Sequence, residues 1–428
     1  MYAVENRLKL WFTGVRHIRI ELPKYVAFII DKLYENGYEA FAVGGCVRDA
    51  VMGRIPHDWD ITTNALPKQV KSIFNKTIDT GIKHGTVTVM LNRVGYEVTT
   101  YRIDGEYTDG RHPKEVVFTP NLTEDLRRRD FTINAMAYND KTGIIDEFDG
   151  IEDIQNKVIR CVGVPEDRFN EDALRMLRAI RFSAQLDFSI DNDTYNAIGK
   201  LYKNLSLISK ERIQTELTKI ITSESPGRIK DICRLGLDRY VFGDNSVLSG
   251  VDISVYEKVS YIMEKLPDNS YLRYAGLLTY ETDIENVLRG LKLDNKTINI
   301  VARLVYNKNK ELSTNKADIR RAVVAIGEDI FSEYYLEYMK ALIKVKHEGI
   351  TLSLEDIDTI SFRYQEIIAD NECLKLNDMA VHGKDLKALG LPDGKLIGDI
   401  LKILFDRVLE NPQLNNKEIL IEMAKKLI

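Results

Sequence analysis

The stretch that most constrains the fold lies between residues 40 and 63. It begins with the apolar run Ala40–Val43, which predicts a short buried strand. Gly44 and Gly45 follow, and residues 47–52 then take up helical spacing. Glycines let the backbone approach an anion closely, and the first N–H groups of a helix point toward it. A strand, a glycine pair and a helix start therefore predict a phosphate-binding loop.

Two acids come next, in the sequence Asp58-Trp59-Asp60-Ile61. Positions two apart on a strand share a face, so an extended segment would point both carboxylates the same way. Such carboxylates repel each other unless a cation lies between them, and Mg²⁺ is commonly held by one or two carboxylates plus substrate phosphates. The alternative is a turn followed by an edge strand with two solvated aspartates. The glycine pair and the acid pair together favour metal-assisted phosphoryl chemistry.

This combination resembles the signature of the DNA polymerase beta nucleotidyltransferase superfamily, a glycine pair followed by D-x-D. The resemblance implies a nucleoside triphosphate substrate and two Mg²⁺ ions.

Length and composition set the broad limits. A chain of 428 residues holds several domains, or one catalytic domain with a long remainder. The net charge of −5 means that any nucleic-acid-binding surface must be local. Four scattered cysteines predict a reducing, cytoplasmic environment, and no apolar run has the length of a membrane span. Residues 1–23 are expected to be an N-terminal extension.

The sequence around the acid pair predicts helices at 24–36 and 68–74, and a hairpin formed by 86–89 and 96–102 around a turn at 92–95. Glu97 shares a face with Thr99 and Tyr101, and it is either a third carboxylate beside the acid pair or a cross-strand surface charge. Residues 103–119 are polar and rich in turn formers, which indicates a functional loop or a disordered hairpin tip.

Residues 121–137 are expected to form a helix capped by Thr123. The charged run at 127–130 is either a solvated helix face or part of a site, since Asp130 and Asn134 stand four apart and both could reach ribose hydroxyls. A last strand and turn at 143–150 close the catalytic domain, and helices are expected from there to the end. The predicted fold class is therefore α+β, a small mixed sheet followed by an elongated all-α part.

A second chemical stretch lies at 168–182, where polar residues recur at every third position: Asp172, Arg175, Arg178 and Arg181. They would form one stripe of a helix, beside an apolar stripe that packs into the core. One interpretation is an ion-paired surface helix, Asp172 with Arg175. Another is phosphate binding by surplus arginines.

A sharper interpretation concerns nucleobases. A carboxylate accepts from an exocyclic amino group and a guanidinium donates to a ring acceptor. Cytosine and adenine both present an amino group beside an acceptor, whereas guanine and uracil present the reverse. An Asp172–Arg175 pair held edge-on would select C and A.

Four motifs in this order (G-G-C-V-R-D, D-W-D-I-T-T, R-R-D-F-T-I-N-A and E-D-A-L-R-M-L-R-A-I-R-F) resemble the class II tRNA nucleotidyltransferases, the CCA-adding enzymes, within the poly(A) polymerase/tRNA nucleotidyltransferase family. The resemblance implies addition of C, C and A to the 3′ end of tRNA from CTP and ATP, with pyrophosphate released. It also implies a head (24–150), a neck (151–220), a body (221–350) and a tRNA-binding tail (351–428).

Residue roles follow from the same resemblance. Asp58 and Asp60 match the metal ligands, with Glu97 as a further catalytic acid. The nucleotide contacts outside the second stretch are Gly44, Gly45, Arg48, Arg129, Asp130 and Asn134. The template for the incoming base and phosphates is Asp172, Arg175, Arg178 and Arg181. The loop at 103–119 resembles the element linked to switching from C to A, which favours full CCA addition.

Three alternatives stay open on the sequence: a poly(A) polymerase, a partial CC- or A-adding enzyme, and a non-catalytic RNA-binding protein with a nucleotidyltransferase head. The oligomeric state is not predicted. The catalytic hypothesis requires the side chains at 58 and 60 to be neighbours and the segment near 172 to line the same site.

Overall fold

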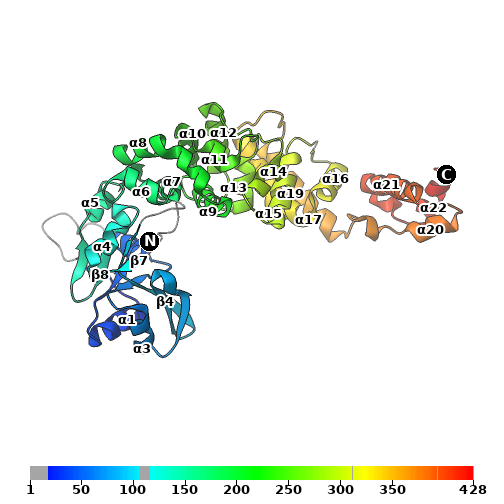
Figure 1. Cartoon of the computed structure of the whole chain (residues 1–428). Helices are drawn as coiled ribbons and strands as arrows, with labels where there is room; N and C mark the ends of the chain where they lie inside the picture. Colours follow the sequence, from blue (N-terminus) through cyan, green and yellow to red (C-terminus); the bar gives the residue numbers. More distant parts are fainter. Residues whose placement is uncertain (1–17, 106–115, 311, 393, 428) are drawn as a thin grey trace. The chain divides into compact units, whose positions relative to one another are not determined.

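The computed structural model describes residues 18–105, 116–310, 312–392 and 394–427, which belong to two compact units (Figure 1). The first comprises Met1–Leu217 with Leu235–Tyr240, and the second comprises Thr218–Arg234 with Val241–Ile428. The first unit contains a mixed sheet and helices, whereas the second is helical. The predicted α+β class, a small N-terminal mixed sheet followed by helical regions, is confirmed.

In the described residues one sheet has seven strands, and only the β2–β5 pair is parallel. Strands were expected near residues 40–43, 86–89, 96–102 and 143–150, whereas the strands at 77–81 and 136–139 were not predicted. In spatial order the strands are β3 (Thr77–Gly81), β4 (Thr86–Leu91), β5 (Val94–Thr100), β2 (Ile61–Thr63), β1 (Ala40–Val43), β8 (Met136–Asn139) and β9 (Gly143–Asp146).

The central strand β1 is buried on both faces, which is why its sequence is a continuous apolar run. Ala40 and Ala42 pack in the core shared with α1 (Lys24–Glu35) and α3 (Pro67–Ile73), two helices that lie side by side in Figure 1. Phe41 and Val43 face the opposite core, where α4 (Leu122–Arg127) packs. Ile20 is also buried in the first of these cores, so residues just before α1 contribute to it.

The β4–β5 hairpin is confirmed, with a tighter turn than expected. Leu91 pairs with Val94, so only Asn92 and Arg93 form the turn, and both adopt positive φ (48° and 67°). Such a two-residue connection matches the twist of the strands that it joins. Gly95 belongs to β5, where an added Cβ would lie 2.7 Å from Thr88 Cγ2.

The expectation of one helix over residues 121–137 was wrong. Helix α4 starts at Leu122 with Asn121 as its N-cap: the backbone N–H of Thr123 donates to Asn121 Oδ1 at 2.9 Å, so Thr123 is not the cap. The chain then forms a short 3₁₀ turn, Thr132–Asn134, and enters β8. Side-chain capping by Asn121 satisfies an N–H that has no partner within the helix.

The predicted irregular segment at 103–119 is described only at its ends. There β6 (Arg102–Asp104) pairs antiparallel with β7 (Val116–Phe118). Residues 106–115, which carry most of the expected functional loop, lie outside the described residues.

Helices dominate after the sheet, apart from a two-residue parallel pair formed by β10 (Val158–Ile159) and β11 (Ser189–Ile190). On helix α7 (Leu174–Leu186) the predicted apolar stripe (Leu174, Leu177 and Ile180) is buried. The helices are α5 (Gly150–Gln155), α6 (Pro165–Glu171), α7 (Leu174–Leu186), α8 (Asn192–Leu201) and α9 (Lys210–Ile221), the last of which ends in the second unit.

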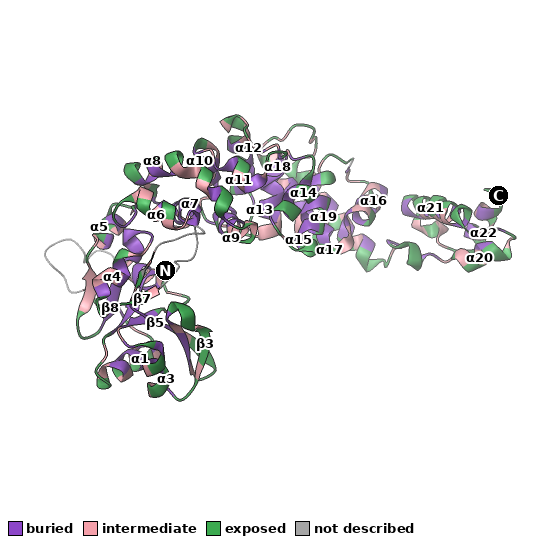
Figure 2. Cartoon of the chain, viewed as in Figure 1, coloured by how far each residue is buried: buried purple, intermediate pink, exposed green. Residues whose placement is uncertain are grey.

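The second unit packs helices whose buried residues gather on their inner faces (Figure 2). Many of these helices begin at an Asp, Asn or Ser whose side chain accepts from the first turn. No described helix is both long and apolar enough to cross a membrane. The main helices are α12 (Ile253–Glu264), α13 (Ser270–Leu277), α14 (Ile284–Gly290), α15 (Asn295–Tyr306), α16 (Lys316–Ile326), α18 (Leu336–Lys344), α19 (Leu354–Ala369), α20 (Gly383–Ala388), α21 (Lys395–Glu410) and α22 (Lys417–Lys425).

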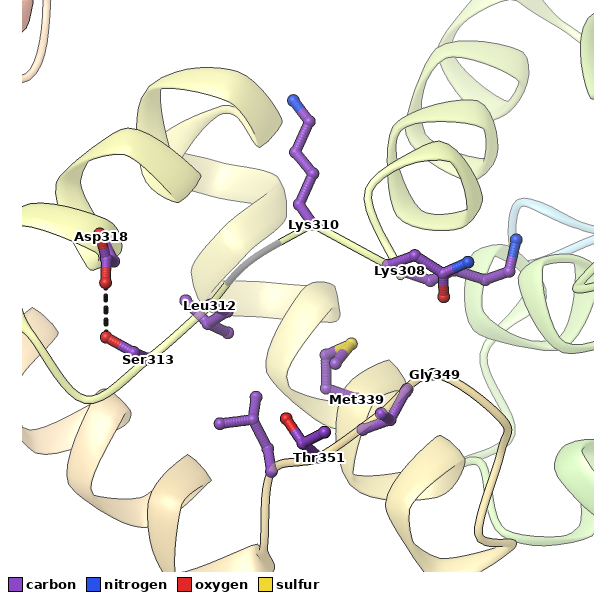
Figure 3. A pocket seen from close by; sticks show the side chains of 11 residues that line it. Lys308, Lys310, Leu312, Ser313, Asp318, Met339, Gly349 and Thr351 are labelled. Atoms are coloured by element: carbon purple, nitrogen blue, oxygen red, sulfur yellow. Dashed lines mark hydrogen bonds between the residues drawn. The ribbon is translucent and has the colours of Figure 1, made fainter.

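A pocket of ≈ 290 Å³ lies in this unit, between α18 and the segments that follow α15 and precede α19 (Figure 3). Lys308 and Lys310 lie at its edge, and Ser313 Oγ donates to Asp318 Oδ2 at 2.5 Å beside it. None of the predicted site residues lines this pocket.

Gly150, at the start of α5, allows a close approach of backbone to backbone. An added Cβ would lie 2.4 Å from the carbonyl oxygen of Thr132. We expect Gly150→Ala to lower the thermal midpoint of the first unit by several degrees, because overpacking a rigid contact costs about 1–3 kcal/mol. Gly199→Ala is the matched control, since its nearest neighbour would be 3.8 Å away inside α8. Equal midpoints for the two variants in a calorimetric scan would contradict this.

Candidate active site

The two predicted acids lie just before β2. The expectation that Asp58 and Asp60 belong to a strand was wrong, since β2 begins at Ile61. The backbone nevertheless joins this segment to the glycine loop, because Val43 N donates to Asp60 O at 3.0 Å. The parallel register pairs Ile61 with Val98, which places Asp60 and Glu97 at the same end of neighbouring strands.

The three acids form one negatively charged group. Burial raises the pKa of Asp60, Arg129 acts against this shift, and Asp58 adds to it. Burial also raises the pKa of Glu97, and the charges of Asp60 and Asp58 raise it further. Glu97 thus lies within electrostatic reach of both aspartates. Its function as a third catalytic acid stays a prediction.

No three His, Cys, Asp or Glu side chains in the described ranges are placed to hold a metal ion by themselves. This fits a site whose metal is completed by substrate, because Mg²⁺ is usually bound by one or two carboxylates plus phosphates and waters. A divalent cation beside Asp58 and Asp60 would also offset the burial and the repulsion from Asp58 that raise the pKa of Asp60.

The glycine loop brings an arginine against the backbone. Gly44 has φ 84° and ψ −132°, a conformation open to glycine, and α2 (Gly45–Val51) starts directly after it. A Cβ at Gly44 would lie 2.8 Å from a terminal guanidinium nitrogen of Arg129. Glycine is therefore favoured here by the positive φ, and its missing side chain leaves room for the Arg129 guanidinium.

The buried carboxylate of Asp125, which the sequence interpretation missed, interacts with Arg128 and Arg129. Asp125 Oδ1 accepts from Arg128 at 2.8 and 3.0 Å, and Asp125 Oδ2 lies 3.6 Å from Arg129. Thr62, in β2, donates to the same carboxylate at 3.2 Å. Burial alone would raise the pKa of Asp125, but the two arginines outweigh it and hold the pKa below its usual range. The i, i+3 and i, i+4 spacing was the available signal.

Asp130 and Asn134 are neighbours, although they do not share a helix. Asn134 Nδ2 donates to Asp130 Oδ1 at 3.1 Å, and Arg48 donates to Asn134 Oδ1 at 2.7 Å. Arg178 Nε donates to Asp130 Oδ2 at 2.7 Å. Although burial opposes it, the charges of Arg178 and Arg175 hold the pKa of Asp130 well below its usual range. The R-R-D-F-T-I-N-A motif is thereby connected to both α2 and α7.

The predicted stripe at 172–181 starts before its helix. Asp172 ends α6, and its Oδ1 accepts from Leu174 N at 3.0 Å at the start of α7. One interpretation paired Asp172 with Arg175. In the structure Asp172 Oδ2 instead lies 2.7 Å from Arg212 of α9, which the sequence interpretation missed. A partner forty residues away leaves no local sequence pattern.

Arg175 has its own set of partners. It donates to Glu171 Oε2 at 2.6 Å and to the carbonyl oxygen of Arg128 at 3.0 Å. Further along α7, Arg181 Nε lies 3.1 Å from Glu216 Oε2, a buried acid of α9 that was also not predicted. Arg178 thereby belongs to the same cluster as Asp130 and Arg48, and the prediction that the segment near 172 lines one site with Asp58 and Asp60 stays a prediction.

Comparison with known proteins agrees with this geometry. Sequence models of three families match in order: the "Poly A polymerase head domain" over residues 40–160, an RNA and SrmB-binding site of polymerase A over 187–244, and tRNA nucleotidyltransferase domain 2 over 274–424. The CCA-adding enzyme of Ligilactobacillus salivarius is 38% identical over 413 residues, which cover 94% of this chain and 95% of that protein. The chain belongs to the class II CCA-adding enzyme family.

Solved structures of CCA-adding enzymes share the fold. The Bacillus stearothermophilus enzyme in complex with CTP is similar with a TM-score of 0.76 at 31% identity, covering 94% of this chain and 96% of that one. The Thermotoga maritima enzyme complexed with tRNA_CCA has a TM-score of 0.65 at 21% identity, covering 96% and 97%, which shows the fold alone. As a member of this family the chain is a nucleotidyltransferase, and the family uses divalent metal ions.

The raised pKa of Asp60 has a consequence for stability. Since the pKa is higher in the folded protein than in the unfolded chain, ionising Asp60 disfavours the fold progressively as pH rises from about 4 through the folded pKa. Asp60→Asn removes this charge, so we expect it to raise the free energy of unfolding at pH 7, with the gain fading toward pH 4. Urea denaturation at both pH values measures the difference.

The control for this prediction is Asp31→Asn, an exposed acid of α1 whose substitution should change little. Adding Mg²⁺ should stabilise the unsubstituted protein more than Asp60→Asn. A less stable Asp60→Asn protein at pH 7 would be the opposite result.

Proposed function

We propose that this protein adds C, C and A to the 3′ end of tRNA, using CTP and ATP without a nucleic-acid template and releasing pyrophosphate. The observation that carries the proposal is the acid group of Asp58, Asp60 and Glu97, in which the two aspartates raise the pKa of Glu97 and Arg129 lies within electrostatic reach of Asp60. Acids destabilised by burial and mutual repulsion, next to an arginine, suit a metal-bound triphosphate. The complex of the Bacillus stearothermophilus relative with CTP supports the same substrate class.

Asp58 and Asp60 would hold Mg²⁺, which when bound supplies activation of the attacking oxygen and neutralisation of the leaving pyrophosphate. The chain's own residues bind and orient. We assign the triphosphate to Gly44, Gly45, Arg48 and Arg129, the ribose to Asp130 and Asn134, and further phosphate contacts to Arg178 and Arg181. Arg129 fits this assignment, because its buried Nε has no hydrogen-bond partner among the described residues. Holding the tRNA 3′-hydroxyl in line with the α-phosphate would provide most of the rate enhancement.

We assign the choice of base to Asp172 and Arg175. Asp172 would accept from the amino group of C or A, and Arg175 would donate to the adjacent ring nitrogen. The proposal is supported by the contacts that fix each side chain. Arg212 donates to both carboxylate oxygens of Asp172. Arg175 forms an ion pair with Glu171 and donates to the carbonyl oxygen of Arg128. Fixed side chains discriminate between base edges better than mobile ones, because an ill-matched base leaves buried groups without partners.

We further propose the division of labour expected from the family. The head at 24–150 would carry out the chemistry and the neck at 151–220 would read the base. The body at 221–350 and the tail at 351–428 would hold the tRNA, which agrees with the tRNA nucleotidyltransferase description of the model that matches 274–424. Because tRNA and both nucleotides are found there, we propose a cytoplasmic location.

Incubation with tRNA that lacks its 3′ end separates the candidate activities. With CTP alone we expect addition of two residues, and with CTP and ATP together a complete CCA end, resolved on a denaturing gel. Asp60→Ala should lower the rate by more than about 100-fold, because loss of even an outer-shell metal partner costs 10- to 100-fold. A long tail from ATP alone would instead indicate a poly(A) polymerase. CTP binding without any transfer would indicate a non-catalytic RNA-binding protein.

Arg175→Ala tests the assignment of base choice. We expect the preference for CTP over UTP to fall by about 10- to 100-fold, because a bidentate contact to a base contributes roughly 1–3 kcal/mol of discrimination. The control is Arg127→Ala, an exposed arginine of α4 paired only loosely with Glu124. Single-nucleotide incorporation with each triphosphate gives the ratios. An unchanged CTP/UTP ratio in Arg175→Ala would remove Arg175 from the base-reading assignment.

A further inference from the structure

The ring of Phe182 lies among three guanidinium groups. The Cζ atoms of Arg181, Arg48 and Arg178 lie 4.0, 5.1 and 5.4 Å from its centroid. Phe182 and two of these arginines belong to α7, whereas Arg48 comes from α2, more than 120 residues earlier. Phe182 is itself 6% exposed, so the contacts form in a poorly solvated region.

Bringing these cations together is unfavourable without compensation. Burial lowers the pKa of Arg181 to about 10, and the charges of Arg178 and Arg48 push it in the same direction, while Glu216 opposes the shift. Asp130 and Glu216 neutralise part of the cluster through Arg178 and Arg181. The face of an aromatic ring is a further source of attraction for a cation within about 6 Å, and it is strongest where water is excluded.

A guanidinium that contacts a ring keeps more of its N–H donors available than one that contacts a carboxylate. A carboxylate takes up N–H donors at the edge of a guanidinium, whereas a ring packs against its flat face. The edge donors then stay directed at other groups. An arginine oriented by a ring can therefore still offer its N–H fork to a phosphate.

We propose that Phe182 is a positioning residue for the triphosphate, and that its ring orients Arg48, Arg178 and Arg181 toward the phosphates of the incoming nucleotide. This inference rests on the proposed function, because it assumes a nucleoside triphosphate at these arginines. The phosphates are common to CTP and ATP, so Phe182 acts equally on both and takes no part in base choice.

A purely structural role is the competing explanation. Phe182 also packs edge-to-face against Phe131, with ring centroids 5.7 Å apart and an interplanar angle of 81°. The two roles depend on different properties of the ring: core packing depends on its shape, whereas attraction of cations depends on the electron density of its face.

Replacing Phe182 with mono-, di- and trifluorinated phenylalanine tests this, since fluorine withdraws electron density while the shape changes little. The Kd values of CTP and ATP are measured by calorimetry with Mg²⁺ and without tRNA, and the thermal midpoint is measured in parallel. We expect Kd to rise stepwise with fluorine content, to about tenfold at three fluorines, by the same factor for both nucleotides. The midpoint should stay nearly constant.

The same series at Phe169 is the control, because Phe169 is fully buried in α6 and the described residues place no cation over its ring. A Kd that does not change across the Phe182 series would overturn the inference, as would an equal rise at Phe169. Failure of the unsubstituted protein to complete a CCA end would instead overturn the proposed function, and the Kd series would still decide the role of Phe182.

Discussion

Burying a charge is costly unless an opposite charge or hydrogen-bond partners meet it, and the first unit is arranged around that constraint. Asp125 is fully enclosed and meets Arg128, and Asp130 meets Arg178. The Asp130–Arg178 pair joins segments that are 48 residues apart in the sequence. The Asp125–Arg128 pair joins residues three apart. Since leaving one partner of such a pair unmatched costs several kcal/mol, the pairs hold the arginine side chains in one arrangement. Asp60 differs from these two acids, because its pKa is raised rather than lowered.

This difference distinguishes acids whose charged form the fold favours from acids whose charged form it disfavours. A carboxylate whose environment favours its charged form contributes to the fold, whereas one whose environment disfavours it reduces stability and is retained for another reason. The surroundings of Asp125 and Asp130 favour the charged form, whereas those of Asp60 and Glu97 disfavour it. Under the proposed function, a metal and a triphosphate would offset this cost, and no complete set of protein ligands for a metal exists in the described residues.

The sequence predicted the parts that depend on short-range pattern. The β1 strand, the glycine pair, the β4–β5 hairpin and the apolar stripe of α7 follow from periodicity and turn chemistry alone. What failed depends on tertiary contacts. Residues 121–137 contain good helix formers, but Met136 and its neighbours complete the sheet beside β1, and pairing overrides propensity. Arg212 and Glu216 could not be predicted, because their partners Asp172 and Arg181 are far away in the sequence. Helix and strand periodicity predicts only contacts between residues a few positions apart.

The course of the chain near residue 217 bears on how the first unit can be isolated. This unit includes Leu235–Tyr240, a short segment that returns to it after an excursion. The ring of Tyr240 lies 6.0 Å from that of Tyr202, and its carbonyl oxygen accepts from Lys210. A polypeptide ending at 217 would leave the Tyr202 ring uncovered and the Lys210 ammonium without that acceptor. A catalytic fragment made for crystallisation or limited proteolysis studies therefore has to continue past residue 240, even though its catalytic motifs end near 182.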